Sequence, residues 1–306
     1  LNMTPAPSSS YSTVVFNIAK IRNQGLEFDI HGDFIRKKDF RWTGNLNISR
    51  NVSKVLDING GPFSDPNDRD AMNLGTSVVK EGEPLGLLYG RVATGIIKTQ
   101  AQLEAAREEF SLWTIFDPYL NLGDIAYEYE DGFWKEDVIG HATPDFFGGY
   151  TNTINWNRFT LTALFTFSYG NDLIYQKDVS DSGMSSLANR GTRVLNHYSE
   201  DNTSSNRPRS MWATTYMLSS LNVYDASYLK LKTLSLSYNL PESICRKVRI
   251  KSASVYGTAT NVFTITSYPG PDPEVSDDPT SVIGGGRDVS TYPTVKSYTF
   301  GIRINF

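Results

Sequence analysis

The sequence lacks the features of several large protein classes. No run approaches the roughly 18 consecutive apolar residues with which a helix spans a bilayer, and no basic segment followed by an apolar stretch resembles a signal peptide. A helical membrane protein is therefore excluded. The single cysteine, Cys245, rules out an intramolecular disulfide framework and a cysteine-based metal cluster, so we expect a buried or turn thiol.

Catalytic motifs are missing as well. The three histidines, His31, His141 and His197, are scattered along the chain, and there is no nucleophile elbow, no His-Glu-x-x-His and no phosphate loop. Paired carboxylates such as Glu108 and Glu109 fall in polar stretches, where solvation explains them better than acid-base chemistry. We expect that the protein is not an enzyme.

What the sequence does contain is alternation. Hydrophobic residues make up 39% of the chain and aromatic residues 12%, with 17 Tyr and 16 Phe, a composition typical of β structure. Apolar and polar residues alternate strictly in four stretches, which predict strands at Leu26–Phe34, Phe40–Ser49, Phe159–Tyr169 and Ser297–Phe306. Strands of this kind are hydrophilic on average, so low hydropathy does not exclude a membrane barrel.

Three further stretches predict strands with a weaker pattern, namely Phe146–Trp156, Tyr228–Tyr238 and Lys251–Phe263. In the second, Leu234 and Leu236 alternate cleanly, but Leu229 and Leu231 fall on the opposite phase. That strand is either bulged or leaves the bilayer at this point, and the pattern does not decide between the two.

The links between these strands are alternately short and long. The short ones are Arg36–Asp39, the two-residue turn Asn157–Arg158 and Leu240–Ile250, and the long ones run over about 54–145, 171–227 and 267–294. Outer-membrane barrels have this asymmetry, with short periplasmic turns and long extracellular loops. If Phe306 lies on the periplasmic side, all three short turns lie there too.

Aromatic residues at the strand ends favour a barrel over a soluble β-sandwich, which would also show alternation. Barrels place such rings in girdles at the two membrane interfaces. The residues in question are Phe34, Trp42, Trp156, Phe159, Tyr169, Tyr238 and Phe306.

Several motifs carry a family resemblance. The stretch from Tyr228 to Pro241, Y-L-K-L-K-T-L-S-L-S-Y-N-L-P, resembles a segment of SusC-like TonB-dependent transporters, the outer-membrane nutrient importers of Bacteroidota. Other matches follow in the family's order: Asn23, Gly25 and Glu27; Asn45 to Asn51; Gly82 to Gly90; Asn261 to Glu274, including Asp272-Pro-Glu274; and Tyr292-Pro293 before the last strand. The resemblance is collinear over nearly the whole chain.

The resemblance implies an all-β fold, an antiparallel transmembrane β-barrel of about 22 strands. Residues 1–306 would be its C-terminal part, with seven or eight strands, and the family's plug and N-terminal domains would lie outside this sequence. Phe306 would be the terminal signal for barrel insertion. The implied partners are a SusD-like surface lipoprotein, TonB–ExbB–ExbD acting through the N-terminal part, the remainder of the same barrel, outer-membrane lipid, and an oligosaccharide or peptide substrate. No nucleic-acid partner is expected.

The long loops are where we expect specificity to reside. A capping-box pattern beginning at Thr99 predicts a short helix with Leu103, Ala106 and Phe110 on its packing face. The loop aromatics Trp113, Tyr119, Trp134, Trp212 and Tyr216 are candidates for contacting sugar faces or peptide side chains, and loop packing is the alternative.

A calcium loop is the other candidate in these links. The family often carries D-x-N-x-D-G there, but in this sequence Tyr127 and Tyr129 occupy two of the positions that need oxygen ligands. Asp124, Glu128, Glu130 and Asp131 could bind calcium in another way, and a solvated acidic loop is the alternative. No other cofactor is expected.

Three functions are compatible with the sequence. The resemblance implies TonB-energised import of an oligosaccharide or peptide, captured under a SusD-like lid. A passive or structural barrel and a soluble carbohydrate-binding β-sandwich are the alternatives. The sequence does not choose between glycan and peptide.

Overall fold

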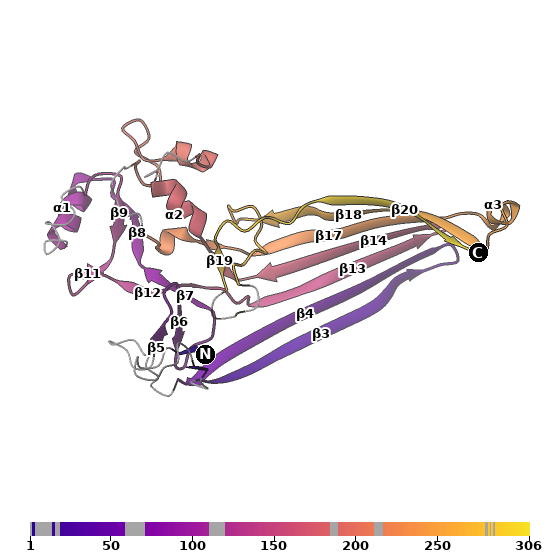
Figure 1. The fold of residues 1–306 in the computed structure, drawn as a ribbon, viewed down its shortest axis with the longest axis horizontal. Helices are drawn as coiled ribbons and strands as arrows, with labels where there is room; N and C mark the ends of the chain where they lie inside the picture. The colour runs from indigo at the N-terminus through magenta and orange to yellow at the C-terminus, as the bar shows by residue number, and fades with distance from the viewer. Residues whose placement is uncertain are drawn as a thin grey trace.

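The computed structural model describes residues 2–3, 14–15, 19–58, 71–109, 120–183, 189–210, 217–278, 281, 283 and 285–306. Its main element is one long antiparallel sheet of seven strands (Figure 1). In chain order these are β3 (Lys20–Arg36), β4 (Phe40–Asp57), β13 (Phe146–Trp156), β14 (Phe159–Tyr169), β17 (Tyr228–Asn239), β18 (Ser252–Thr266) and β20 (Ser297–Asn305). Each pairs with the next in the chain, so β3 and β20 form the two edges.

These strands confirm the seven predicted by alternation, and several are longer than predicted. β13 and β14 have the predicted bounds, whereas β3 begins at Lys20 and β4 continues to Asp57. The tertiary structure lengthens β3 and β4 because they pair with each other beyond their alternating segments, as far as Lys20 opposite Asp57.

The register gathers the apolar residues of all strands on one face. Following one row across the sheet, Phe28 lies beside Ile48, Ile48 beside Gly148, Gly148 beside Phe167, and Phe167 beside Leu229. Many large apolar side chains of this face are exposed; Phe28 is 60% exposed and Phe300 84%. A soluble protein rarely exposes so continuous an apolar surface, and no second sheet covers it within the described residues. So exposed a face differs from the buried inner face of a β-sandwich.

A bulge in β17 resolves the phase conflict left open by the sequence. Leu164 of β14 is opposite Thr233, but the next residue, Phe165, is opposite Leu231, which leaves Lys232 as an extra residue. The extra residue shifts the alternation by one and brings Leu229 and Leu231 onto the same face as Leu234 and Leu236. On the other side of β17, β18 accommodates the irregularity with Asn261 in a left-handed conformation, at φ 51°.

The links differ at the two ends of the sheet, as predicted. Residues 37–39, 157–158 and 240–251 connect strands at one end, which we call the turn end, and it also holds the C-terminus (Figure 1). The third of these links contains an unpredicted short helix, α3 (Glu242–Lys247), in which the predicted buried thiol, Cys245, is 1% exposed. The links 58–145, 170–227 and 267–296 emerge at the opposite end, the loop end.

Rings occur where girdles were expected. Near the turn end, the ring of Phe159 lies 6.3 Å from that of Trp156 and 4.7 Å from that of Tyr238, centroid to centroid. At the loop end, Phe146 stacks on Tyr169 at 5.0 Å. Two aromatic bands therefore border the apolar face.

The long links fold into small sheets and helices of their own. Their strands are β5 (Ala71–Asn73), β6 (Ser77–Lys80), β7 (Leu87–Arg91), β8 (Ala93–Ile96), β9 (Ile125–Tyr127), β10 (Tyr129–Glu130), β11 (Phe133–Trp134), β12 (Glu136–His141), β15 (Asp172–Tyr175), β16 (Val223–Asp225) and β19 (Arg287–Asp288); near the N-terminus, β1 (Asn2–Met3) pairs with β2 (Val14–Val15). The helices are α1 (Gln100–Glu109), α2 (Gln176–Gly183), η2 (Thr192–Asn196) and η3 (Ser220–Asn222). In the described part of the chain, no helix is both long and apolar enough to cross a membrane.

Helix α1 confirms the predicted capping box. The Thr99 hydroxyl accepts a hydrogen bond from the backbone N–H of Gln102 at 3.2 Å, and the Gln102 side chain accepts one from the backbone N–H of Thr99 at 3.1 Å. Leu103 packs inward and is 4% exposed, as expected for the packing face, whereas Phe110 lies outside the described residues.

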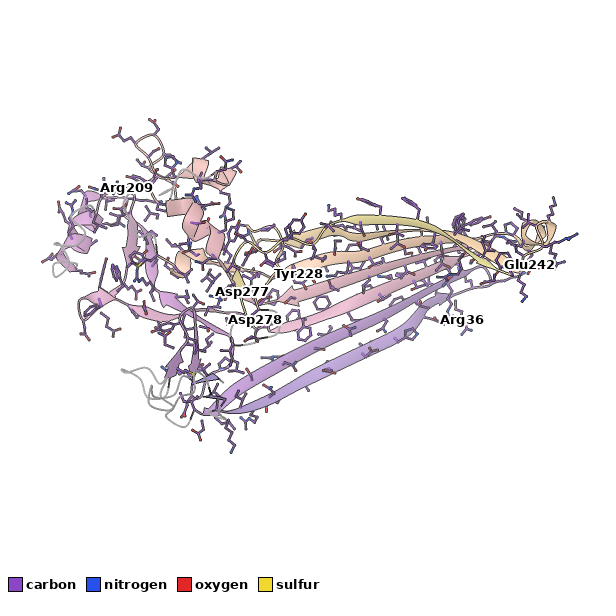
Figure 2. All side chains as sticks on the ribbon, viewed as in Figure 1. Arg36, Arg209, Tyr228, Glu242, Asp277 and Asp278 are labelled. Carbon is purple, nitrogen blue, oxygen red and sulfur yellow. The ribbon has the colours of Figure 1, made fainter. Side chains whose placement is uncertain are left out.

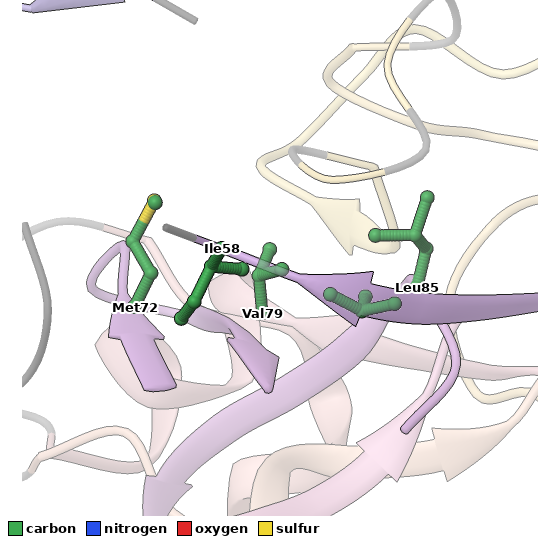
Figure 3. Close-up of a cluster of buried hydrophobic side chains, with 5 residues drawn as sticks. Ile58, Met72, Val79 and Leu85 are labelled. Carbon is green, nitrogen blue, oxygen red and sulfur yellow. The ribbon is translucent and has the colours of Figure 1, made fainter. Parts of the chain in front are cut away.

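The buried core lies in the loops rather than against the large sheet. A cluster at the loop end unites the end of β4 with β5 and β6; it consists of Val55, Ile58, Met72, Val79 and Leu85 (Figure 3). Most residues of the long strands are half-buried or exposed on both faces of the sheet. The cluster therefore packs the loops at the end of β4 and does not cover the polar face of the sheet.

Candidate functional site

The face of the sheet opposite the apolar one is lined with hydroxyl and amide groups. One row runs across all seven strands and consists of Asp33, Thr43, Thr153, Thr162, Ser235, Thr258 and Thr299. Neighbouring hydroxyls in such rows bond to each other, as Ser235 does to Thr258 at 2.9 Å. His31 lies on this polar face, as its phase predicted. Hydroxyl and amide groups can hydrogen-bond a polar solute both as donors and as acceptors. The one charged member of the row, Asp33, pairs with Arg41 at 3.0 Å.

At the loop end, this face carries a buried cation. Lys230 of β17 is 1% exposed, and its ammonium donates to Asp272 at 3.0 Å and to Glu274. Lys232, the bulge residue, donates to the same Glu274 carboxylate at 2.7 Å, and the Tyr228 hydroxyl donates to it at 3.1 Å. Two lysines and two carboxylates balance in charge, so the cluster is a satisfied buried network rather than an isolated ion.

The two carboxylates belong to the loop 267–296, and the network ties that loop to the sheet. Burial alone would raise the pKa of Asp272, but hydrogen bonds from Thr294, from the backbone N–H of Glu274 and from Lys230 lower this pKa below its usual value. The pKa of Glu274 is likewise raised by burial and lowered, on balance, by Lys230 and Lys232. Both groups are therefore held as anions.

A second set of contacts anchors the far part of the same loop. β19 pairs in parallel with β15, and the Tyr268 hydroxyl donates to Asp288 at 2.9 Å. The ring of Tyr268 also packs edge-on against Tyr175 and Tyr224, with centroids 5.7 and 6.5 Å apart. The loop is thus joined to β17 at one point and to the link after β14 at another.

Between these anchors lies a pocket of about 650 Å³ that opens at the loop end of the polar face. Its polar lining includes Ser168, Asn171, Tyr228, Lys232, Glu274 and Asp278. Figure 2 places Tyr228, Asp277 and Asp278 together where the sheet meets the loops. The volume and the mixed lining suit a small polar ligand or a segment of a longer one.

Of the loop aromatics predicted to contact substrate, only Trp134 lies in the described residues; Trp113, Tyr119, Trp212 and Tyr216 lie outside them. Trp134 is in β11, opposite Tyr129, and the Arg91 guanidinium lies over its ring at 4.1 Å. This contact packs the loop internally. Substrate contact by these aromatics stays a prediction.

The four acids of the candidate calcium loop have separate surroundings. Asp124 pairs with Arg209 at 2.7 Å, Glu128 pairs with Lys135 at 3.1 Å, and Glu130 is exposed. Asp131 and Gly132 form the tight turn of a hairpin, with positive φ at both residues. In the described residues no three acid, histidine or cysteine side chains are grouped to hold a metal ion, so this geometry lends the calcium prediction no support.

The network of Lys230, Asp272 and Glu274 was not predicted as a site. Its residues stand in two motifs of the family resemblance, Tyr228 to Pro241 and Asp272-Pro-Glu274, and the opposite charges of those motifs were the available signal. Without the fold, however, 42 residues separate the partners.

This chain is similar to known proteins in sequence and in fold. No family model matches the chain. It is 31% identical over 312 residues to TonB-dependent receptor P3 of Formosa agariphila, and 23% identical over 320 residues to TonB-dependent receptor SusC of Bacteroides thetaiotaomicron; each alignment covers 99% of this chain. The chain spans about a third of these relatives, at 31% and 28% of their lengths.

Solved structures show the same fold. The RagAB peptide importer in its closed-closed state aligns with 99% of this chain and 31% of its own, with a TM-score of 0.73 and 23% identity. Its open-open state aligns with a TM-score of 0.70 and 21% identity. The seven-stranded sheet and its loops therefore have the fold of part of such a transporter barrel.

Proposed function

Because this chain is SusC-like and matches TonB-dependent receptors over nearly all of its residues, we propose that it forms part of an outer-membrane transporter for nutrients. The observation that carries the proposal is the division of one sheet into two chemically distinct faces. The apolar face, bordered by aromatic bands, would contact lipid, and the polar face would line the lumen. No catalytic step is part of the proposal.

The transported molecule would be an oligosaccharide or a peptide. Rows of hydroxyl and amide groups suit both, since each presents many donors and acceptors. The pocket beside Lys232, Glu274 and Asp278 lies where the loops meet the lumen face, and it would be an early contact for a solute that enters from the loop end. The neighbouring structure is described as a peptide importer, which supports the peptide alternative without deciding it.

We further propose that transport is energised through TonB and that a SusD-like lipoprotein covers the loop end. The names of the relatives support the first statement, and the two-component importer RagAB supports the second. In this arrangement the remainder of the barrel would continue from the edge strands β3 and β20, because an unpaired strand edge is not tolerated in lipid.

Deletion of the gene that encodes this chain tests the proposal. The mutant should lose growth on at least one class of oligosaccharide or peptide, and the intact gene should restore that growth. The encoded protein should fractionate with outer membranes. Unaffected uptake of every glycan and peptide tested, or a protein found in the soluble fraction, would contradict the proposed function.

A further inference from the structure

The turn end of the sheet carries an unbalanced positive charge. Segments 36–39, 157–158 and 240–251 together contain eight Lys and Arg residues but only two acids, Asp39 and Glu242. The long links 58–145, 170–227 and 267–296 contain 13 Lys and Arg residues and 27 Asp and Glu residues. The net charge is therefore +6 on these three turn-end segments and -14 on the long links, in a chain whose total is only -4.

The basic side chains at the turn end are directed to the surroundings. We call them the basic rim: Arg36, Lys37, Lys38, Arg158, Arg246, Lys247, Arg249 and Lys251, all of them exposed. Arg36 lies 3.7 Å from Asp33, and Arg246 lies 3.0 Å from Glu242 with both side chains 80% exposed. The other six form no ion pair with the described residues. Exposed pairs of this kind neutralise little, so most of the rim's charge is available to a partner.

The rim adjoins the apolar face. The aromatic band of Trp156, Phe159 and Tyr238 lies next to it, and Figure 2 shows Arg36 and Glu242 at the same end of the sheet. In α3 and the residue after it, Ile244 is 46% exposed and Val248 60% exposed, four residues apart and so on one side of the helix. Apolar side chains flanked by exposed Lys and Arg are typical of a segment that lies in a membrane interface.

We propose that the basic rim binds the anionic headgroups of phospholipids in the leaflet that surrounds the turn end. This inference rests on the proposed placement of the sheet in a membrane. Long Lys and Arg side chains at the level of the aromatic band reach the phosphates while their stems stay along apolar surface. A soluble polyanion would match the charge alone, whereas a phospholipid also matches the adjoining apolar face and the exposed Ile244 and Val248.

The test uses the complete encoded protein, purified in neutral detergent and titrated with phosphatidylglycerol or with phosphatidylcholine, with bound lipids counted by native mass spectrometry. One variant carries Lys37→Gln, Lys38→Gln, Lys247→Gln and Arg249→Gln. Its matched control carries Lys37→Arg, Lys38→Arg, Lys247→Arg and Arg249→Lys, which keeps every charge.

We expect the native protein and the charge-conserving control to prefer phosphatidylglycerol, and we expect the glutamine variant to lose at least about tenfold of that preference, since each basic residue near an anionic surface contributes severalfold to binding. Inorganic phosphate at the same concentration should not displace the lipid. For the native protein, raising NaCl towards about 1 M should abolish the preference, because the Debye screening length is then only ~3 Å. This salt titration tests the proposal even if the glutamine variant does not fold.

An equal preference for phosphatidylglycerol in the glutamine variant and the control would overturn the proposal, and so would a preference that survives high salt. Full displacement of the lipid by inorganic phosphate would overturn the assignment to lipid. These failures differ from failure of the proposed function, in which the protein would not fractionate with outer membranes at all.

Discussion

Replacing Lys230 with methionine should release the loop 267–296 from the sheet while the strands stay paired. Methionine is close to lysine in length but has no charge, so the change leaves Asp272 and Glu274 without the cation between them. Lys230 and Asp272 are 1% and 4% exposed, and water cannot replace the lost contact without opening the site.

The structure sets the expected size of the effect. Removing one partner of a buried ion pair costs about 3 to 5 kcal/mol. Here Glu274 retains its bond from Lys232 at 2.7 Å, and Asp272 retains bonds from Thr294 and from the backbone N–H of Glu274. We therefore expect a cost near the lower bound, ~3 kcal/mol, which raises the open population of the loop roughly hundredfold.

Hydrogen exchange on the complete protein in detergent measures this opening. The amides of Glu274 and Thr294, both bonded to Asp272, should exchange about a hundredfold faster, whereas strand amides of β14 and β17 should not change. Lys247→Met, which removes an exposed lysine, is the matched control and should leave all these rates unchanged. Exchange at Glu274 and Thr294 that is the same in Lys230→Met and the native protein would refute the role assigned to Lys230.

Three further outcomes follow from the structure. The pKa values of Asp272 and Glu274 lie below their ordinary 3.8 and 4.5, so the two carboxylates stabilise the loop fully above those values and lose this effect as the pH falls through the lower folded pKa values. Hydrogen exchange of the loop, corrected for intrinsic rates, should therefore accelerate only below about pH 4. A transition near neutral pH would contradict this expectation. A Cβ atom added at Gly148 would lie 2.1 Å from the Asn47 carbonyl oxygen, whereas a Cβ atom at Gly32 would have nothing within 4 Å. Gly148→Val should therefore destabilise the protein by about 1 to 3 kcal/mol in thermal unfolding, and Gly32→Val should not. Equal melting temperatures of the two variants would count against the strand register. Deletion of Lys232 removes the bulge and places Leu231 directly before Thr233, so regular alternation keeps Leu229 and Leu231 on the apolar face with Leu234. The variant should therefore still reach the heat-modifiable folded form on gels, and loss of that form would contradict the bulge.

The residues alone were enough to predict the large sheet and the chemistry of its two faces. Alternation is a local property, because successive side chains of a strand point to opposite sides whatever the strand pairs with. The bounds of β13 and β14 could therefore be predicted to the residue, and the capping box of α1 could be predicted because its bonds join residues only three apart. The asymmetry of the links followed from the spacing of the strands.

Long-range pairing decided the rest. In the sequence, Lys230 looks like any residue on the polar face of a strand, and only the return of the loop after β18 brings Asp272 and Glu274 to it. The bulge was undecidable in the sequence because an out-of-phase Leu229 fits two structures, and only the register against β14 selects one of them. The sequence also contains every charge of the basic rim, but its three segments are far apart in the chain. The antiparallel course of the strands brings them to one end of the sheet, because every second link of a meander must return to the same side.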